Sequence, residues 1–223
     1  MRPLPKAFYA RPTLDVARDL LGRLVVHDHP DDGTLVGRIV ETEAYTENDP
    51  AFHGWGLVDR STGRVRPEGR AYALFGEPGD AYVYLNYGIH WLLNAVTEEA
   101  GTGGAVLVRA LEPVLGLDAM RRRREAARRP RDLTNGPGKL TSALGVDGRH
   151  HGGTLLETPL YLAAGEPVDD TEVEATARIG LSKGNDRDWR FIVRASEFVS
   201  PGRPGVAPKR RRGQPRTGPE RRR

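Results

Sequence analysis

The stretch RIVETEAY, residues 38–45, determines how the rest of the chain has to be arranged. It predicts a β-strand, in which successive side chains point to opposite faces. On that alternation one face carries Leu35, Ile39, Glu41, Glu43 and Tyr45, and the other carries Val36, Arg38, Val40, Thr42 and Ala44. A strand that passes from apolar residues to carboxylates leaves a core and enters a cleft. Glutamates also occur on edge strands merely to discourage aggregation, and that alternative stays open at this point.

The composition is that of a globular protein. A chain of 223 residues with 38% hydrophobic residues can bury a sizeable core, most simply as one domain. It contains no cysteine, which excludes disulfides, thiolate metal ligands and thiol catalysis. The N-terminal residues lack the apolar core of a signal peptide, and no apolar run approaches membrane-spanning length. We therefore expect a cytoplasmic protein without a membrane partner.

The positive charge is concentrated at the C-terminus. Residues 202–223 hold nine Lys or Arg against the single acid Glu220, a balance of +8. Because the formal total is +4, residues 1–201 together carry −4. We expect residues 1–201 to form the folded unit. Residues 202–223 are predicted to be a basic disordered tail that contacts nucleic acid non-specifically.

Periodicity and turn residues predict the order of elements. Thr13 is expected to cap a short amphipathic helix that stops at Gly22. Residues 81–87 and a return strand from Trp91 predict a hairpin with Tyr87 near its tip. Pro113 is expected to open a helix that runs into the arginine-rich residues 121–129. A further helix is predicted within 134–146, and strands are predicted at 24–27, 35–45, 105–112, 160–163, 177–181 and 189–194.

Residues 46–78 have little periodicity but many aromatic residues. A loop of this length in a compact domain is usually functional or disordered. Its aromatic content, which includes Phe52, His53 and Trp55, favours function over a solvated linker. His53 taken alone has a structural role more often than a catalytic one.

Three further features concern charge. Arg109 lies inside the apolar run AVLVRALE and needs an anionic partner, either a structural one or a carboxylate of a site. Residues 121–132 contain seven arginines against two acids, which is either a solvated helix face or a nucleic-acid contact. Lys139 lies near the N-terminus of the predicted helix with Pro137, where the helix dipole favours an anion such as phosphate.

Several motifs occur together and in a specific order. RIVETEAY, DPAFHG, YVYLNYG, the Asn94 beyond it, VLVRALEP, GPGKL and ARIGLSKG resemble the alkyladenine (3-methyladenine) DNA glycosylase family, in its monofunctional form. The resemblance runs from about the first predicted helix to Ser200. It implies a single α+β domain, in which a curved, mostly antiparallel sheet carries a base pocket and helices surround the sheet.

The resemblance also implies catalytic roles. Glu43 matches the general base that activates a water to attack C1′ of the damaged nucleoside. Arg109 matches the residue that helps to hold that water and keeps Glu43 ionised, and the backbone carbonyl of Ile179 is expected to contact the same water. Glu41 lies on the same predicted face, and only the resemblance selects Glu43 instead of it.

The remaining matches concern the base and the DNA. Tyr45, His53 and Tyr84 match residues that stack on a flipped base, and Asn94 matches a filter against the 2-amino group of guanine. Tyr87 matches the side chain that intercalates in the minor groove. Lys139, Arg121 and Arg122 are the candidates for contacts with the DNA backbone. The family usually carries an Asn and a Met in the segment that here reads VRPEGRAYALF (65–75), with Leu74 in place of the Met.

The expected function is base-excision repair. A base must leave the stack before it is processed, which is least costly for damaged or mispaired bases. We expect a monomeric enzyme, in the cytoplasm at the nucleoid, that removes 3-methyladenine, and hypoxanthine or ethenoadenine, from double-stranded DNA and leaves an abasic site. We expect no metal and no cofactor. No Lys occupies a nucleophile position in the matched motifs, so we expect no lyase step.

Two other functions compete with this one. In a glycoside hydrolase, Glu41 and Glu43 would act as an acid/base pair with their carboxyl groups about 5–9.5 Å apart. A non-catalytic nucleic-acid-binding protein would use the basic tail and the arginine-rich segment.

Overall fold

The fold is built on one antiparallel sheet. A computed structural model of the chain describes residues 1–59 and 61–202, so the expected tail from residue 203 onward lies outside the described residues. Six strands follow in the order β3-β4-β5-β2-β1-β6; β8 pairs with β2, and β7 pairs with β8. The strands are β1 (Leu24–His29), β2 (Gly33–Thr46), β3 (Ala81–Asn86), β4 (His90–Val96), β5 (Gly104–Leu115), β6 (Leu160–Ala163), β7 (Val173–Thr176) and β8 (Arg190–Val193).

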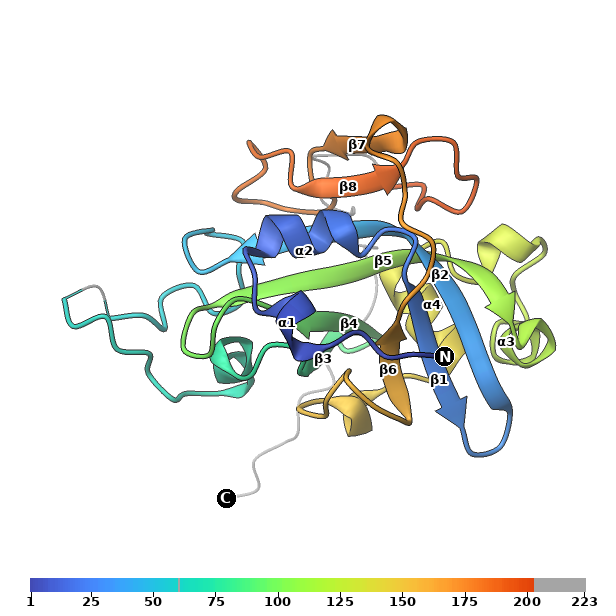
Figure 1. Cartoon of the computed structure of the whole chain (residues 1–223), viewed down its shortest axis with the longest axis horizontal. Coiled ribbons are helices and arrows are strands. Elements are labelled where there is room, and N and C mark those ends of the chain that lie inside the picture. The colour runs from blue at the N-terminus through green and yellow to red at the C-terminus, as the bar shows by residue number, and fades with distance from the viewer. Residues whose placement is uncertain (60, 203–223) are drawn as a thin grey trace, which may run out of the picture.

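Short helices surround this curved sheet, which confirms the predicted α+β class. They are α1 (Lys6–Tyr9), α2 (Thr13–Asp19), α3 (Leu117–Arg123) and α4 (Pro137–Leu144), with 3₁₀ turns at Arg70–Phe75, Pro130–Asp132, Gly148–His150 and Asp170–Glu172. Figure 1 shows α2 in front of the long strands β2 and β5 and α4 behind them. Among the helices of the described residues, none has the length and apolar composition needed to cross a membrane.

Two bulges between β2 and β5 determine which residues face the interior. The pairing passes from Thr42↔Val108 to Glu41↔Ala110, so Arg109 is an extra residue on β5. It then passes to Ile39↔Leu111, so Val40 is an extra residue on β2. An extra residue reverses the alternation of side chains.

The prediction that Leu35 and Ile39 share a face with the two glutamates is therefore wrong. Leu35, Ile39 and Ala44 pack in the main apolar core, and the hydroxyl of Thr42 donates to the Ala17 carbonyl of α2 at 2.7 Å. Glu41, Glu43 and Tyr45 do share a face, as predicted. The bulge at Val40 lies before these three residues on β2, and the bulge at Arg109 lies on the partner strand β5, so neither interrupts the alternation between them.

Three predictions of local structure are also wrong. Pro113 does not open a helix, because it belongs to β5 and pairs with Gly37 beside a register shift, the kind of irregular position at which a strand tolerates proline. The helix starts only at Leu117, after Gly116 in the left-handed region, and ends at Arg123. Residues 177–181 are irregular, and the strand in that part of the chain is β7.

Thr13 does not cap its own helix. Pro12 precedes α2, and the backbone N–H and hydroxyl of Thr13 both donate to the Glu98 carboxylate at 2.6 Å. Glu98 adopts a positive φ of 67° near the start of the β4–β5 connection, so a distant side chain supplies the cap that sequence reasoning assigned to Thr13.

The predicted hairpin is present. Asn86 and His90 face each other across a tight turn in which Tyr87 and Gly88 have φ values of 50° and 73°. Ile89 N–H donates to the Asn86 carbonyl at 3.0 Å, which closes a type I′ turn. This turn leaves the Tyr87 side chain 75% exposed at the tip.

A pair of histidines connects β1 with the 3₁₀ turn at Gly148–His150. His27 is buried; its Nδ1 lies 2.7 Å from the carbonyl of Leu144, and its Nε2 lies 3.3 Å from Nε2 of His150. Burial lowers the pKa of His27, an effect that the Leu144 contact opposes and the neighbouring His150, His29 and Arg123 reinforce. The folded chain therefore holds His27 neutral.

The stability should fall on acidification because of this pair. The unfolded chain takes up a proton at His27 as the pH drops below about 6.5, before the folded chain does, so stability is present above that pH and is lost below it. Melting curves at pH 7.5 and 5.5 should show this loss in the wild type. His27→Gln should be less sensitive to pH, whereas His90→Gln, in the exposed hairpin, should behave as the wild type does.

Candidate active site

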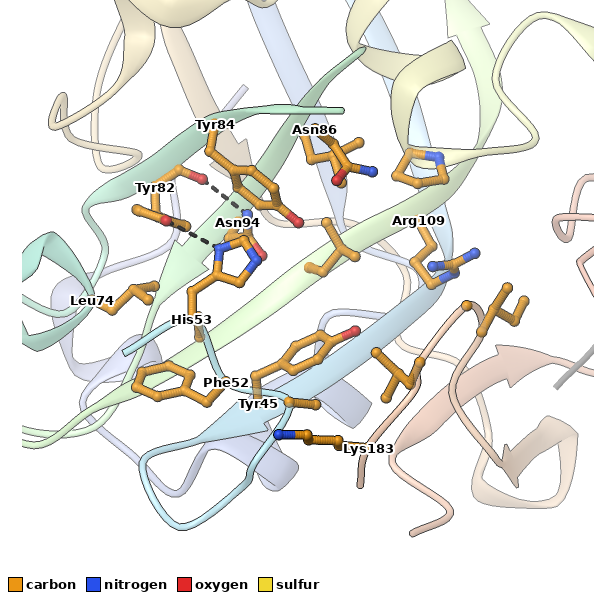
Figure 2. Close-up of a pocket in the computed structure, with 18 of the residues that line it drawn as sticks. Tyr45, Phe52, His53, Leu74, Tyr82, Tyr84, Asn86, Asn94, Arg109 and Lys183 are labelled. Atoms are coloured by element: carbon orange, nitrogen blue, oxygen red, sulfur yellow. Dashed lines mark hydrogen bonds between the residues drawn. The ribbon is translucent and has the colours of Figure 1, made fainter. Parts of the chain in front are cut away.

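One large cavity lies on the face of the sheet that carries Glu43 and Tyr45. Its volume is about 710 Å³, within the range of about 300–1,000 Å³ that is usual for small-molecule sites. Figure 2 shows the rings of His53 and Tyr84 across the cavity from the ring of Tyr45, with Arg109 at one end. The lining includes Tyr45, Phe52, His53, Leu74, Tyr82, Tyr84, Tyr87, Asn94, Leu107, Arg109, Ile179, Lys183 and Gly202.

One wall of the cavity is aromatic. The ring centroids of His53 and Tyr84 lie 4.4 Å apart, and those of Tyr82 and Tyr84 lie 5.4 Å apart. Nδ1 of His53 lies 3.2 Å from the hydroxyl of Tyr82, which fixes the imidazole ring. Burial, assisted by the charge of Arg70, lowers the pKa of His53 below its ordinary value near 6.5. The wall is thus uncharged at neutral pH and offers flat π surfaces.

Glu43 is fully buried behind the opposite wall. Its Oε2 accepts a hydrogen bond from the Tyr45 hydroxyl at 2.7 Å and lies 3.2 Å from Nη1 of Arg109. Its Oε1 accepts a hydrogen bond from the backbone N–H of Ile179 at 2.7 Å. Tyr45, Arg109 and Ile179 all line the cavity. The three donors therefore hold the carboxylate directly behind the cavity surface.

Arg109 bridges two carboxylates. Its Nε donates to Glu41 at 2.8 Å, while Nη1 pairs with Glu43. Burial by itself lowers the pKa of Arg109, but the charges of Glu43 and Glu41 outweigh that effect and raise it. The anionic partner that the apolar surroundings of Arg109 require is thus a pair of carboxylates.

A buried ion pair supports Tyr45 from outside the cavity. The Arg178 guanidinium forms an ion pair with Asp49 and donates to the carbonyls of Ala44 and Gly184, each at 2.8 Å. It also lies 4.5 Å from the ring centroid of Tyr45, in cation–π geometry. Because Arg178 precedes Ile179 in the chain, it fixes two of the three groups that contact Glu43. Burial, then the Glu43 charge, raises the pKa of Tyr45 well above its ordinary value, so its hydroxyl remains a donor.

Asn94 and Leu74 complete the wall. The Asn94 side chain is buried, and its Nδ2 donates to the Tyr82 carbonyl at 3.0 Å, which holds the amide in one orientation. Leu74, in the segment that departs from the family pattern, is buried and still presents an apolar side chain to the cavity. Arg70 of the same segment lies 5.6 Å from the ring centroid of Tyr84.

Comparison with known proteins identifies the family. A family model described as methylpurine-DNA glycosylase (MPG) matches residues 7–197, which include every residue of the aromatic wall and the carboxylate cluster described above. The chain belongs to the methylpurine-DNA glycosylase family.

Relatives from three organisms carry the name "Putative 3-methyladenine DNA glycosylase". The protein of Salinibacter ruber is 58% identical over 92% of this chain and 99% of its own length. Those of Methanoculleus marisnigri and Carboxydothermus hydrogenoformans are 45% and 42% identical, each over 88% of this chain and 98% of its own length. This glycosylase is therefore a hydrolase of N-glycosyl bonds whose substrate is DNA.

The contacts of Glu41 differ from those expected of a partner acid that faces the cavity. Both oxygens of the Glu41 carboxylate accept hydrogen bonds from the buried residues Arg109, Arg190 and Ser200, of which only Arg109 lines the cavity, whereas all three donors to Glu43 line it. The geometry thus gives no support to an acid/base pair of Glu41 and Glu43 on either side of a sugar. Within the described residues there is also no group of three or more His, Asp or Glu side chains that could hold a metal ion.

The predicted cations lie in two different places. Lys139 is near the cavity, where Pro137 contributes to the lining, and its ammonium donates to the Asn135 side chain at 2.6 Å. Burial, then the charge of Arg124, lowers the pKa of Lys139. Arg121 and Arg122 are exposed on α3, where they pair with Asp118 at 2.9 Å and with Asp32 at 2.6 Å. Asp32 adjoins the start of β2, whereas Tyr45 is near its end, so these two arginines lie far from the cavity.

Sequence reasoning missed the residues that support the site. Asp49 lies in the DPAFHG motif and Arg178 lies in ARIGLSKG. An acidic residue in one matched motif and a basic residue in another could have indicated an ion pair between them. Arg190 and Ser200, which bind Glu41, had no such signal because the fold alone brings them to β2.

Asp49→Asn should destabilise this glycosylase strongly. The substitution leaves the buried Arg178 charge without its anion, which typically costs about 3–5 kcal/mol. Urea unfolding monitored by circular dichroism measures the loss. The matched control is Asp170→Asn, which breaks the exposed pair with Arg18 and should leave the midpoint unchanged. Equal unfolding midpoints of the two variants would show that the buried ion pair contributes no more to stability than the exposed one.

Proposed function

We propose that this glycosylase removes alkylated or deaminated purines, 3-methyladenine first and hypoxanthine or ethenoadenine as further candidates, from double-stranded DNA. The observation that carries the proposal is the buried Glu43 carboxylate, held by three donors that all line an aromatic cavity. The enzyme acts as a monomer without a cofactor, in the cytoplasm at the nucleoid. Its product is an abasic site.

The aromatic wall recognises the base. A purine that leaves the stack keeps its stacking energy only if it meets other π surfaces, and His53, Tyr84 and Tyr45 offer such surfaces on two sides. Many alkylated purines carry a positive charge, for which a cation–π contribution of about 0.5–2 kcal/mol favours damaged over normal bases. The neutral state of His53 avoids repulsion of such a cation.

Glu43 supplies the base for hydrolysis. A water beside the sugar loses a proton to Glu43 while its oxygen attacks C1′; the bond from C1′ to the purine nitrogen breaks, and its electron pair leaves with the base. A cationic alkylated purine then departs as a neutral molecule. Arg109 helps to hold the water and the ionised carboxylate. The N–H of Ile179 donates to Glu43, and the carbonyl of Ile179 contacts the water.

Two residues govern access to the pocket. Asn94, fixed by its bond to the Tyr82 carbonyl, crowds the position that the 2-amino group of guanine would take. Tyr87, at the exposed hairpin tip, enters the minor groove and fills the gap that the flipped nucleotide leaves. Lys139, Arg121 and Arg122 contact the DNA backbone, the arginines at a distance from the flipped base.

Glu43→Gln should abolish turnover and retain binding. The amide keeps the shape of the side chain but accepts no proton, so base release should fall at least about a hundredfold. The assay measures alkali-dependent strand breaks in duplexes that carry hypoxanthine or ethenoadenine, and in alkylated DNA. Glu112→Gln, on the half-buried end of β5, serves as the control and should retain wild-type activity. Full activity of Glu43→Gln would refute its assignment. Salt-sensitive binding without release from any lesion in the wild type would favour the non-catalytic binding protein.

Tyr87→Ala should weaken engagement of DNA without damage to the fold. The side chain is exposed, so its loss should not alter the melting temperature, but loss of a stacking group should cost about 1–3 kcal/mol of affinity for lesion DNA. Fluorescence anisotropy with a lesion duplex measures this loss. The control is Tyr72→Ala, which removes another exposed tyrosine. If the two variants bind equally well, Tyr87 does not intercalate.

A further inference from the structure

Glu41 and Arg190 are buried, charged and unused by the mechanism above. Arg190 Nε donates to Glu41 Oε1 at 2.7 Å, and the same oxygen accepts from Arg109 Nε at 2.8 Å. Ser200 binds both carboxylate oxygens, through its backbone N–H at 2.6 Å and its hydroxyl at 2.8 Å. Burial alone raises the pKa of Glu41, but Arg109 and Arg190 outweigh it and lower the pKa. Glu41 is therefore a fixed negative charge.

These contacts make a cluster with balanced charge. Two carboxylates, Glu41 and Glu43, face two guanidinium groups, Arg109 and Arg190, and Arg109 is shared by both carboxylates. The other titratable groups that face Glu43 are the phenols of Tyr45 and Tyr84, both of which burial keeps protonated by raising their pKa. Without Glu41 the cluster would carry one net positive charge immediately behind the cavity.

A net positive charge at this point would oppose the proposed reaction. Cleavage of an N-glycosidic bond develops positive charge on the sugar, as in other oxocarbenium-like transition states. An Arg109 guanidinium that is not balanced would repel that charge, and it would also make Glu43 a weaker base.

We propose that Glu41 is a positioning and charge-balancing residue, which neutralises Arg109 so that this guanidinium can orient Glu43 without opposing the cationic transition state. The inference rests on the proposed function and deepens it. Ser200 and Arg190 hold Glu41 in place, so the segment that leaves β8 toward Gly202 also serves the active site.

Three variants test the charge directly. Glu41→Gln keeps an oxygen that can accept from Arg109 but removes the charge; we expect kcat to fall at least about tenfold and the acid limb of the pH–rate profile to move to lower pH by about one pH unit. Arg190→Gln leaves one net negative charge and should move that limb to higher pH. The double variant restores the balance and should recover kcat and the acid limb toward the wild type.

The readouts separate this role from a structural one. If Glu41 only maintains the packing, the double variant will be at least as impaired as Glu41→Gln, and the two single variants will not move the acid limb in opposite directions. Either result overturns the inference. Lesion binding and melting temperature are measured on all three variants and on the Glu112→Gln control. Failure of the proposed function can be told apart from failure of this inference, because in the first case the wild-type enzyme itself releases no base.

Discussion

The site depends on one guanidinium that two buried carboxylates share. Arg109 sits in a strand whose neighbours, Val108 and Ala110, are buried and apolar, where an unpaired charge would cost several kcal/mol. The sheet accommodates this charge through the bulge that makes Arg109 an extra residue on β5, which aims its side chain toward Glu41 and Glu43 on β2. A bulge that redirects a side chain is thus the structural origin of the site, and the long antiparallel pairing of β2 and β5 on both sides of it keeps the geometry rigid. The cluster forms only when these two strands are in register.

Much of this arrangement could be predicted from the sequence. The alternation in residues 35–45 and 81–97 predicted β2 and the β3–β4 hairpin, and the apolar run around Arg109 predicted both β5 and the need for an anionic partner. The bulges could not be predicted, because nothing in the local sequence marks Val40 or Arg109 as an extra residue; pairing between strands decides it. For the same reason the faces of Leu35 and Ile39 were assigned wrongly. The helix start predicted at Pro113 is wrong because a proline favours a helix start locally, whereas pairing with Gly37 beside a register shift places this proline in β5.

The support of the site was less predictable than the site itself. The cavity side chains come from a few motifs that are each continuous in sequence, so the resemblance to the family could identify them one by one. Arg178, Asp49, Arg190 and Ser200 act only through contacts with residues far away in the chain, such as the donation from the Ser200 backbone to Glu41, 159 residues before it. Composition and periodicity contain no information about such pairs. Buried charged residues inside otherwise matched motifs are the one signal that a sequence offers for them.

Under the proposed function, Tyr45 couples recognition of the base to the orientation of the carboxylate. Its ring lines the cavity, its hydroxyl donates to Glu43 at 2.7 Å, and Arg178 lies 4.5 Å from its ring centroid. A base that stacks on Tyr45 must therefore bind against a ring that is already fixed by Arg178 and already bonded to the carboxylate. Any tilt of the ring to fit a different base would lengthen the bond to Glu43 and disturb the pairing with Arg109 on the same oxygen. A planar base that fits without tilting the ring would leave the carboxylate in the position that the proposed mechanism requires, so in that mechanism the shape of the pocket acts on the chemical step as well as on binding.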